Sequence, residues 1–386
     1  MHAMSSMLDQ VVSFIKELYK QDGVIQLHEP MFTGNEKKYL TQCIDSTFVS
    51  SIGPFVEKFE NGISRYASVK HAIATVNGTS ALHIALLLAG VRPGDEAITQ
   101  PLSFVATANA IRYAGANPIF VDVDRETLGM SPARLEDFLD KETIIEDDGL
   151  CYNKKTRAKI KACIPVHVLG HPLKINKIVR LCNRYHIPVI EDAAAALGSK
   201  HQGNQVGSFG DMGIFSFNGN KIITCGGGGI IVTNNDELAE KAKHITTTAK
   251  IPHKWEISHN MIGYNYRLPN LNAALGYAQL EKIDVFLENK RQTAAEYLQF
   301  FSELGIKTVT EPKDSYSNYW LNAVIMKDKK ERELFIGHMY NNKIMTRPIW
   351  KPLNRLPMYE LCQASNLENS EWLAERIVCL PSSVRA

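Results

Sequence analysis

Short apolar runs alternate with amphipathic segments over most of residues 72–245. The apolar runs have the length of buried strands, and the segments between most of them carry apolar residues at helical spacing. Strands separated by helices are typical of a mostly parallel sheet with helices on both faces, so we predict an α/β fold with a seven-stranded sheet. The expected strands are 72–76, 96–100, 118–123, 162–168, 187–191, 212–217 and 229–233, and the expected helices are 79–89, 103–114, 131–140, 174–185 and 235–245.

The two ends of the chain predict further elements. Apolar spacing indicates a short N-terminal helix, and Pro269 precedes a long segment of helical periodicity. The expected helices are 6–20, 35–66 with a loop at 50–54, 270–303 and 330–341, and the expected strands lie near 319–326 and 343–347. These patterns divide the chain into an N-terminal helical arm (1–26), a large α/β domain (27–282) and a smaller α+β C-terminal domain (283–386).

Two groups of residues add detail to this division. Residues 141–160 are polar and charged, and we expect an inserted β-hairpin or loop on the surface. Four aromatic residues are expected to form a small core in the C-terminal domain: Tyr316, Tyr319, Trp320 and Trp350.

The composition is that of an ordinary globular protein. The chain has 386 residues, of which 45% are hydrophobic and 22% charged, and its net charge of +2 gives no reason to expect nucleic acid or a membrane as partner. The seven cysteines include no C-x-x-C pair, and no His/Cys/Asp cluster has metal-ligand spacing, so we expect reduced thiols, a cytoplasmic location and no metal. Residues 1–20 lack the long apolar core of a signal peptide.

The stretch 210–230 is the first candidate for chemistry. Its apolar run 214–217 is followed by small polar residues, Lys221 and four consecutive glycines at 226–229. Burial beside a strand lowers the pKa of an ammonium group, and a lysine with a depressed pKa is a good Schiff-base nucleophile. Glycines let the backbone approach a planar group closely or adopt positive φ. The alternative is a tight turn that carries a solvated lysine.

The stretch 187–199 is the second candidate. A short apolar strand ends in Glu191 and Asp192, and small residues follow. An acid at the carboxyl end of a parallel strand lies where α/β folds bind their ligands. Such a carboxylate can keep a pyridine nitrogen protonated, as pyridoxal phosphate requires. The candidate is Asp192, and the alternative is an ordinary acid that caps the next helix.

Together these stretches resemble the sugar aminotransferase family named DegT/DnrJ/EryC/StrS. The family pattern E-D-A-A-Q-A-L-G is matched by residues 191–194, F-S-F-x-x-x-K by residues 215–221, and T-x-G-x-G-G by residues 224–229. The resemblance runs from about Pro30 to Ser383. It departs at Ala195, where the family usually has a glutamine that supports the cofactor's ring hydroxyl, so that contact is left to water or to another group.

The resemblance implies a pyridoxal-phosphate enzyme of fold type I. Lys221 would hold the cofactor and shuttle a proton, and Asp192 would face the pyridine nitrogen. L-glutamate would give an amino group that a nucleotide-linked keto sugar then accepts. Related dehydratases have histidine in place of this lysine, so Lys221 favours the aminotransferase. The rivals are a dehydratase or other pyridoxal enzyme, and a catalytically silent cofactor-binding protein, which Ala195 makes conceivable.

A phosphate site is expected where the first strand meets its helix. Asn77, Gly78, Thr79 and Ser80 open that helix with a glycine, hydroxyls and free amides. The family places the cofactor phosphate here, against Gly78 and Thr79 or Ser80, with the hydroxyl of Ser216. N-capping by the same residues is the alternative, and the two are compatible because the amides left over by the cap bind the phosphate.

Two further cofactor contacts are implied by the resemblance. Phe104 follows a strand end at the place of the aromatic residue that stacks on the pyridine ring, although a core phenylalanine is the alternative. Asn265 lies in a G-x-N-Y-R segment whose asparagine reaches the phosphate of the neighbouring subunit, which implies a homodimer with shared sites. The alternative for Asn265 is the cap of a turn. His167 and His171 flank a strand end near Gly170 and could face the site.

The substrate is suggested by residues 346–354. They resemble an R-P-x-W-x-x-x-H segment of enzymes that aminate carbon 4 of UDP-linked 4-keto-6-deoxy-N-acetylhexosamines, on routes to bacillosamine, legionaminic acid and surface glycans. Arg347 would bind a substrate phosphate or the donor carboxylate, or it is an exposed strand-end arginine. Residues 28–30, the insertion at 141–160 and residues 217–221 also resemble the legionaminic branch, but Asn354 replaces the usual histidine. GDP- or dTDP-linked keto sugars are the alternative substrates.

Overall fold

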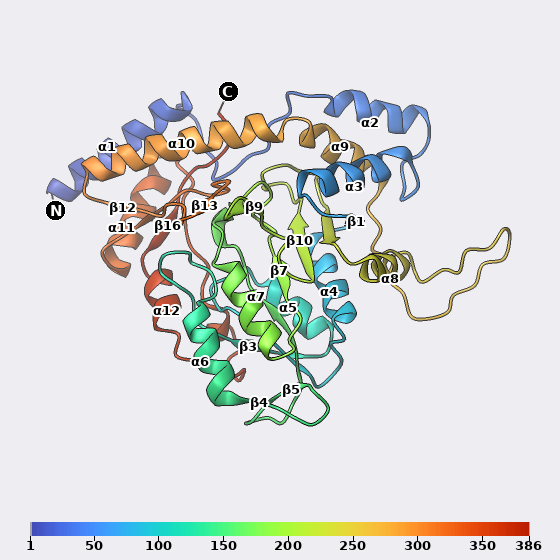
Figure 1. Ribbon diagram of the computed structural model, residues 1–386. Coiled ribbons are helices and arrows are strands. Elements are labelled where there is room, and N and C mark those ends of the chain that lie inside the picture. Colours follow the sequence, from blue (N-terminus) through green and yellow to red (C-terminus); the bar gives the residue numbers. More distant parts are fainter. Residues whose placement is uncertain (1, 386) are drawn as a thin grey trace.

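The computed structural model describes residues 2–385 and is built around a seven-stranded sheet (Figure 1). Two hydrogen-bonded groups, in the orders β1-β11-β10-β7 and β3-β2-β6, are joined by parallel bridges between Cys163 and Val189 and between Val166 and Asp192. Only β11 runs antiparallel to its neighbours within these groups. The strands are β1 (His71–Thr75), β2 (Glu96–Thr99), β3 (Asn117–Phe120), β6 (Ile160–Ile164), β7 (Ile190–Asp192), β10 (Met212–Ser216) and β11 (Gly229–Thr233). The mostly parallel seven-stranded sheet is therefore confirmed.

Helices cover both faces of this sheet, as the apolar strands require. On one face, Ile214 of the sheet and Ile84 of α4 (Gly78–Leu88) share a core with α5 (Ala106–Tyr113) and α8 (Asp236–Thr246). Phe138 and Ile178 bring α6 (Pro132–Glu142) and α7 (Ile175–Arg184) into a second core. A third core, around Phe59 and Phe217, includes α2 (Glu36–Asp45), α3 (Pro54–Tyr66) and α9 (Asn270–Leu280).

The single helix expected over 270–303 is wrong. The chain forms α9 and then α10 (Ile283–Glu303), and the backbone of Lys282 between them leaves the helical region with φ −110° and ψ 1°. The Glu281 carboxylate accepts hydrogen bonds from the Tyr39 hydroxyl at 2.7 Å and the Asn35 amide at 2.8 Å. These contacts hold the end of α9 against α2, so α10 can take its own direction into the C-terminal part.

The C-terminal part is a small α+β unit. Its sheet has the order β12-β14-β16-β15, and α1 packs with α10 and α11 around Tyr297, Phe301 and Phe335. The elements are α1 (His2–Tyr19), β12 (Lys307–Thr308), β14 (Ala323–Ile325), α11 (Lys329–Asn341), β15 (Arg347–Pro348), α12 (Glu368–Ala374) and β16 (Ile377–Cys379). The expected aromatic core is wrong, because Tyr316 covers the Arg291 guanidinium at 3.9 Å and Trp320 and Trp350 line a cavity.

The remaining elements are short. The insertion at 141–160 contains an antiparallel hairpin, as expected, formed by β4 (Thr143–Ile145) and β5 (Cys151–Asn153). The others are η1 (Val168–Gly170), β8 (Lys200–His201), β9 (Asn204–Gln205), β13 (Ser315–Tyr316) and η2 (Leu353–Arg355). No helix within residues 2–385 has the length and apolar character needed to cross a bilayer. The division at 26 and 282 stays a prediction.

Candidate active site

A cavity of about 360 Å³ opens at the carboxyl ends of β1, β2, β7 and β10, where the large sheet meets the small unit. This is the edge at which α/β sheets bind their ligands. Seven of the predicted site residues line the cavity, namely Gly78, Thr79, Phe104, Asp192, Ser216, Lys221 and Arg347. Segments far apart in the sequence therefore meet at one place, as the motifs predicted.

The N-terminus of α4 forms one end of the cavity. The Asn77 side chain caps the helix by accepting a hydrogen bond from the amide of Ser80 at 2.8 Å. The amides of Gly78 and Thr79 have no backbone acceptor among the described residues. A Cβ atom at Gly78 would lie 3.0 Å from that of Ser216, so the serine side chain lies directly beside these amides. Two amides, a hydroxyl and the positive end of a helix dipole suit a phosphate.

Asp192 forms a second wall and is only 4% exposed. Its Oδ2 accepts a hydrogen bond from the Thr107 hydroxyl at 2.6 Å, and its Oδ1 accepts one from the amide of Ala194 at 3.2 Å. Burial raises the pKa of this carboxyl, while these two hydrogen bonds and the nearby Lys221 oppose the rise. A carboxylate in such surroundings gains most from a cationic partner such as a protonated pyridine nitrogen.

Glu191 points away from this wall and braces the structure behind it. Its carboxylate accepts hydrogen bonds from the amides of Gly207, Phe209 and Gly210 at 2.6 to 2.9 Å. His167 lies 3.1 Å from the same carboxylate through Nε2, while its Nδ1 accepts the amide of Leu173 at 3.2 Å. The proton of the imidazole is therefore on Nε2. Glu191 and Asp192 therefore have separate roles, because successive side chains of a strand point to opposite faces.

Lys221 reaches the cavity from the loop after β10. Burial lowers the pKa of its ammonium group, Asp192 opposes this effect and Arg347 adds to it, and together they bring the pKa to about 8. The Nζ atom lies 3.8 Å from the centre of the Trp320 ring. Among the described residues no carboxylate lies within ion-pair distance of this Nζ. Lys221 therefore loses its proton at a lower pH than an ordinary lysine.

The glycines after Lys221 serve the packing of the loop. Gly226 has φ of +76°, which favours glycine. A Cβ atom on Gly229 would overlap the backbone of Asn77. These glycines therefore allow β11 to lie directly against the turn that begins α4. This close approach places Ser216 beside that turn.

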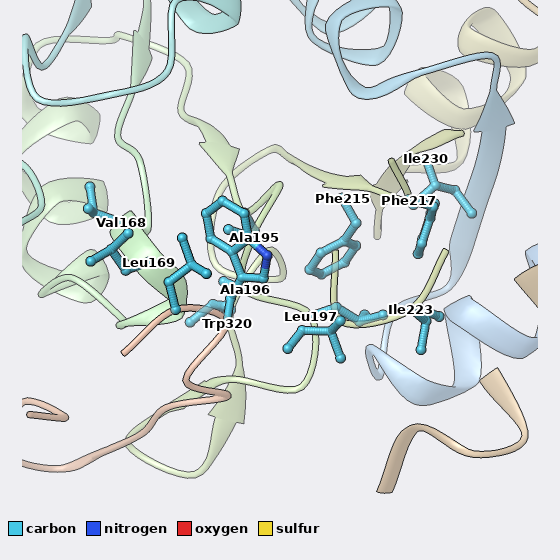
Figure 2. Close-up of a cluster of buried hydrophobic side chains, with 14 of the residues drawn as sticks. Val168, Leu169, Ala195, Ala196, Leu197, Phe215, Phe217, Ile223, Ile230 and Trp320 are labelled. Carbon is cyan, nitrogen blue, oxygen red and sulfur yellow. The ribbon is translucent and has the colours of Figure 1, made fainter. Parts of the chain in front are cut away.

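Phe104 and Ala195 lie on the wall of the cavity near Asp192. The Phe104 side chain is 58% exposed, so it is a free aromatic face and no core phenylalanine. The carbonyl of Ala195 accepts a hydrogen bond from the Asn318 amide at 2.9 Å, which leaves only its methyl group for the cavity. Figure 2 shows Ala195 and Ala196 beside Trp320. The polar contact that a longer side chain would make at position 195 is missing from this wall.

Three residues from the small unit complete the cavity: Trp320, Arg347 and Trp350. Arg347 begins β15 and pairs with Cys379 of β16, so its backbone is fixed by the sheet. No carboxylate of the described chain lies within ion-pair distance of its guanidinium group. An unpaired guanidinium in a cavity wall is a binding group for an anion.

Two predicted site residues lie elsewhere. Ser80 does not line the cavity, and its amide is taken by the cap. Asn265 is exposed and accepts two hydrogen bonds from Arg267 at 3.0 and 3.1 Å. His171 is buried beside Tyr319 and burial lowers its pKa to about 4, so of the two strand-end histidines only His167 lines the cavity. Within the described residues no His/Cys/Asp/Glu group could hold a metal ion.

Thr107, Trp320 and Trp350 were not assigned to the site from the sequence. Thr107 is one helical turn beyond Ser103, whose hydroxyl lies 3.2 Å from the Thr107 hydroxyl, so a polar pair at that spacing was the available signal. The two tryptophans belong to the other unit of the fold and carry no local signal, because only the docking of that unit brings them to the cavity.

Comparisons with known proteins show the family of the chain. The profile of the family described as "DegT/DnrJ/EryC1/StrS aminotransferase family" matches residues 30–386. The chain belongs to this family. It is therefore a sugar aminotransferase, and its cofactor is pyridoxal phosphate.

Individual members of the DegT/DnrJ/EryC1/StrS family match along most of the chain. GDP-perosamine synthase of Escherichia coli O157:H7 is 41% identical over 87% of both proteins. A protein of Bacillus subtilis strain 168, named provisionally as the pyridoxal phosphate-dependent aminotransferase EpsN, is 37% identical over 93% of this chain and 90% of its own. The crystal structure of a family aminotransferase from Brucella abortus has a TM-score of 0.82 at 28% identity and covers 90% of each chain.

The residues of this chain fit pyridoxal phosphate. The free amides of α4 and the hydroxyl of Ser216 suit its phosphate, Asp192 suits its ring nitrogen and the exposed face of Phe104 suits its ring. Lys221 offers an amine with a lowered pKa to its aldehyde. The position in this cavity that lacks the expected polar side chain is Ala195.

Proposed function

We propose that this enzyme moves the amino group of L-glutamate to carbon 4 of a GDP-linked 4-keto-6-deoxy sugar. The observation that carries the aminotransferase chemistry is that Lys221 and Asp192 line one cavity, with an anion site at its end. When bound, the cofactor supplies an electron sink that stabilises negative charge on the reacting carbon.

The GDP-linked substrate is favoured over the UDP-linked one by the relatives. A relative 41% identical to this chain is named for a GDP-linked product, perosamine. The segment 346–354 still favours the UDP-linked N-acetylhexosamines, but Asn354 departs from that pattern. Similarity along 87% of the chain outweighs similarity of a few short segments. Bacillosamine and legionaminic acid precursors are the alternatives for the test below.

The roles of the cofactor contacts follow from the cavity walls. The amides of Gly78 and Thr79 and the hydroxyl of Ser216 would hold the phosphate, and Asp192 would keep the ring nitrogen protonated. Phe104 would lie against the ring. Lys221, whose pKa is lowered to about 8, would hold a proton in one step and release it in the next.

Arg347 would bind the α-carboxylate of the donor. Its charge is close enough to act on the pKa of Lys221, so it lies near the reacting atoms. The α-carboxylate of glutamate is bonded directly to the carbon that carries the amino group. In the sugar nucleotide, the diphosphate is across the ring from carbon 4. A charged group near Lys221 therefore suits the donor carboxylate better than the diphosphate.

We also propose a homodimer in which Asn265 reaches the partner's phosphate site. In support, the segment between α8 and α9 projects from the body of the chain (Figure 1). It carries exposed apolar side chains, including Trp255 at 78% and Ile262 at 86%. Apolar groups on a projecting segment are typical of one that packs on another copy of the chain.

The test is a competition between acceptors. The purified enzyme receives glutamate and an equimolar mixture of GDP-, UDP- and dTDP-linked 4-keto-6-deoxy sugars, and mass spectrometry follows each amino product. We expect the GDP-linked amino sugar to form at least about tenfold faster than the others, the discrimination that one or two specific contacts to a base supply. Preference for a UDP-linked sugar would overturn the GDP assignment, and a deoxy product without nitrogen would favour the dehydratase.

A further inference from the structure

The side chains of Lys221 and Trp320 form a contact that the cofactor chemistry above does not use. Lys221 Nζ lies 3.8 Å from the centre of the indole ring, and Trp320 is only 3% exposed. At this distance an ammonium group is attracted by the negative face of the ring, and the attraction is strongest where water is excluded. The indole ring therefore stabilises the ammonium group of Lys221 at this position.

The indole ring is fixed at both ends. Its Nε1 donates a 2.6 Å hydrogen bond to the carbonyl of Asn220, the residue before Lys221. The backbone amide of Trp320 donates to Asn318 Oδ1 at 2.8 Å, and the Asn318 amide donates to the carbonyls of Ala195 and Leu197 at 2.9 Å each. Trp320 is thus tied to the loop that carries the lysine and to the segment that follows Asp192.

Among the groups around Lys221, the Trp320 ring is the nearest one that stabilises a positive charge on its amino group. Arg347 opposes a positive charge on Nζ, while Asp192 favours it without forming an ion pair among the described residues. Trp350 lines the same cavity, but it has no cation–π contact with Lys221 among the described residues. The two tryptophans therefore form a matched pair, one in contact with the lysine and one not.

We propose that Trp320 is a positioning residue that holds the amino group of Lys221 whenever this lysine is not bonded to the cofactor. The inference rests on the proposed function of Lys221. In each transfer Nζ takes up one proton and later releases one proton, so the chain ends with the protons it began with. The ring stabilises the intervening ammonium form and keeps it within the cavity. Without the ring, a flexible side chain would spend part of its time in other rotamers.

The direct test measures the titration of Lys221 in the full-length protein after removal of the cofactor. Amine acetylation is followed over the neutral to alkaline range, and mass spectrometry quantifies the peptide that contains Lys221. Trp320→Leu should lower the pKa of Lys221 by about 1 unit, the size expected for a desolvated cation–π contact. Trp320→Phe keeps a ring and should give a smaller decrease. Trp350→Leu is the matched control and should leave the pKa unchanged.

A second measurement covers the case in which Trp320→Leu fails to fold. Fluorinated tryptophan is incorporated into the Trp350→Phe protein, because each fluorine weakens the negative face of the ring with little change in shape. The pKa of Lys221 should then fall stepwise with the number of fluorine atoms. An unchanged pKa throughout, or an equal decrease in Trp350→Leu, would overturn the proposal.

The kinetics separate positioning from binding. Single-turnover rates with glutamate and with the keto sugar should fall by the same factor in Trp320→Leu, about tenfold, because Lys221 serves both halves of the reaction. The KM for glutamate should stay unchanged. If the wild-type enzyme transfers no amine, the proposed function fails, whereas an unchanged Lys221 titration beside normal wild-type transfer overturns the role of Trp320 alone.

Discussion

The Thr107 hydroxyl donates a 2.6 Å hydrogen bond to the Asp192 carboxylate at the wall of the cavity. Burial raises the pKa of Asp192 and this bond lowers it, so the threonine helps to keep the carboxylate ionised. The negative charge that we propose faces the ring nitrogen of the cofactor therefore depends on a residue from α5.

Replacing Thr107 by valine should move the acid limb of the pH–rate profile. Loss of the hydrogen bond raises the pKa of Asp192 further, so the carboxyl becomes protonated at a higher pH and activity is lost earlier as the pH falls. We expect an upward shift of about 1 pH unit, the size of one hydrogen bond to a charged group. Thr107→Ser keeps the hydroxyl and should retain the wild-type profile. A valine variant with an unmoved acid limb would contradict this role.

Asp192 should matter far more than the departure at Ala195. Asp192→Asn should slow the single turnover with glutamate by about a hundredfold or more, because a preorganised charge is lost. Ala195→Gln should change the same rate by less than about tenfold, since water replaces much of the missing hydrogen bond. Stopped-flow absorbance of the two variants measures both rates. A rise by orders of magnitude in Ala195→Gln would mark the natural chain as a degenerate enzyme.

Arg347 should contribute to the binding of the amino donor, glutamate. Arg347→Gln should raise the KM for glutamate by about tenfold to a hundredfold, the range for a charge-assisted hydrogen bond. Its effect on the KM for the keto sugar should be less than about threefold, and Arg347→Lys should recover part of the loss because the charge remains. Steady-state kinetics with each substrate varied gives both constants. The opposite pattern, with the sugar affected more, would assign Arg347 to the substrate phosphate.

Asn265 provides the test of shared sites. Asn265→Ala should weaken cofactor binding without loss of the fold, because the side chain is exposed in a single chain. Subunits carrying Lys221→Ala and subunits carrying Asn265→Ala are then mixed under conditions that allow exchange. Each mixed dimer should regain one working site, which a titration of bound cofactor and a rate measurement detect. Exchange without any recovery would mean that each site is built from one chain.

The meeting of several predicted site residues at one place was predictable because they lie at or just after the ends of strands. Asp192 and Ser216 end β7 and β10, and Gly78 begins the helix after β1, so the topology alone brings them to one edge of the sheet. The break between α9 and α10 was not predictable from periodicity. It depends on contacts of Glu281 with α2, which the sequence separates from it by more than two hundred residues.

The contribution of the small unit also could not be predicted from the sequence. Trp320 precedes a strand of that unit, and nothing local distinguishes it from a core residue. Its contact with Lys221 arises only because the small unit docks at the carboxyl edge of the large sheet. Arg347 was found through its motif, but its lack of a carboxylate partner is visible only in the folded chain.

The most direct measurement of the central claim follows the nitrogen atom itself. Wild-type enzyme and Lys221→Ala are incubated with ¹⁵N-labelled L-glutamate and the GDP-linked 4-keto-6-deoxy sugar, and mass spectrometry quantifies ¹⁵N in the sugar. We expect the wild type to place one ¹⁵N atom in each product molecule over many turnovers, and Lys221→Ala to form none beyond background. Multiple turnovers in Lys221→Ala, or a wild type that releases no ¹⁵N-labelled sugar from any of the nucleotide-linked acceptors, would contradict the assignment.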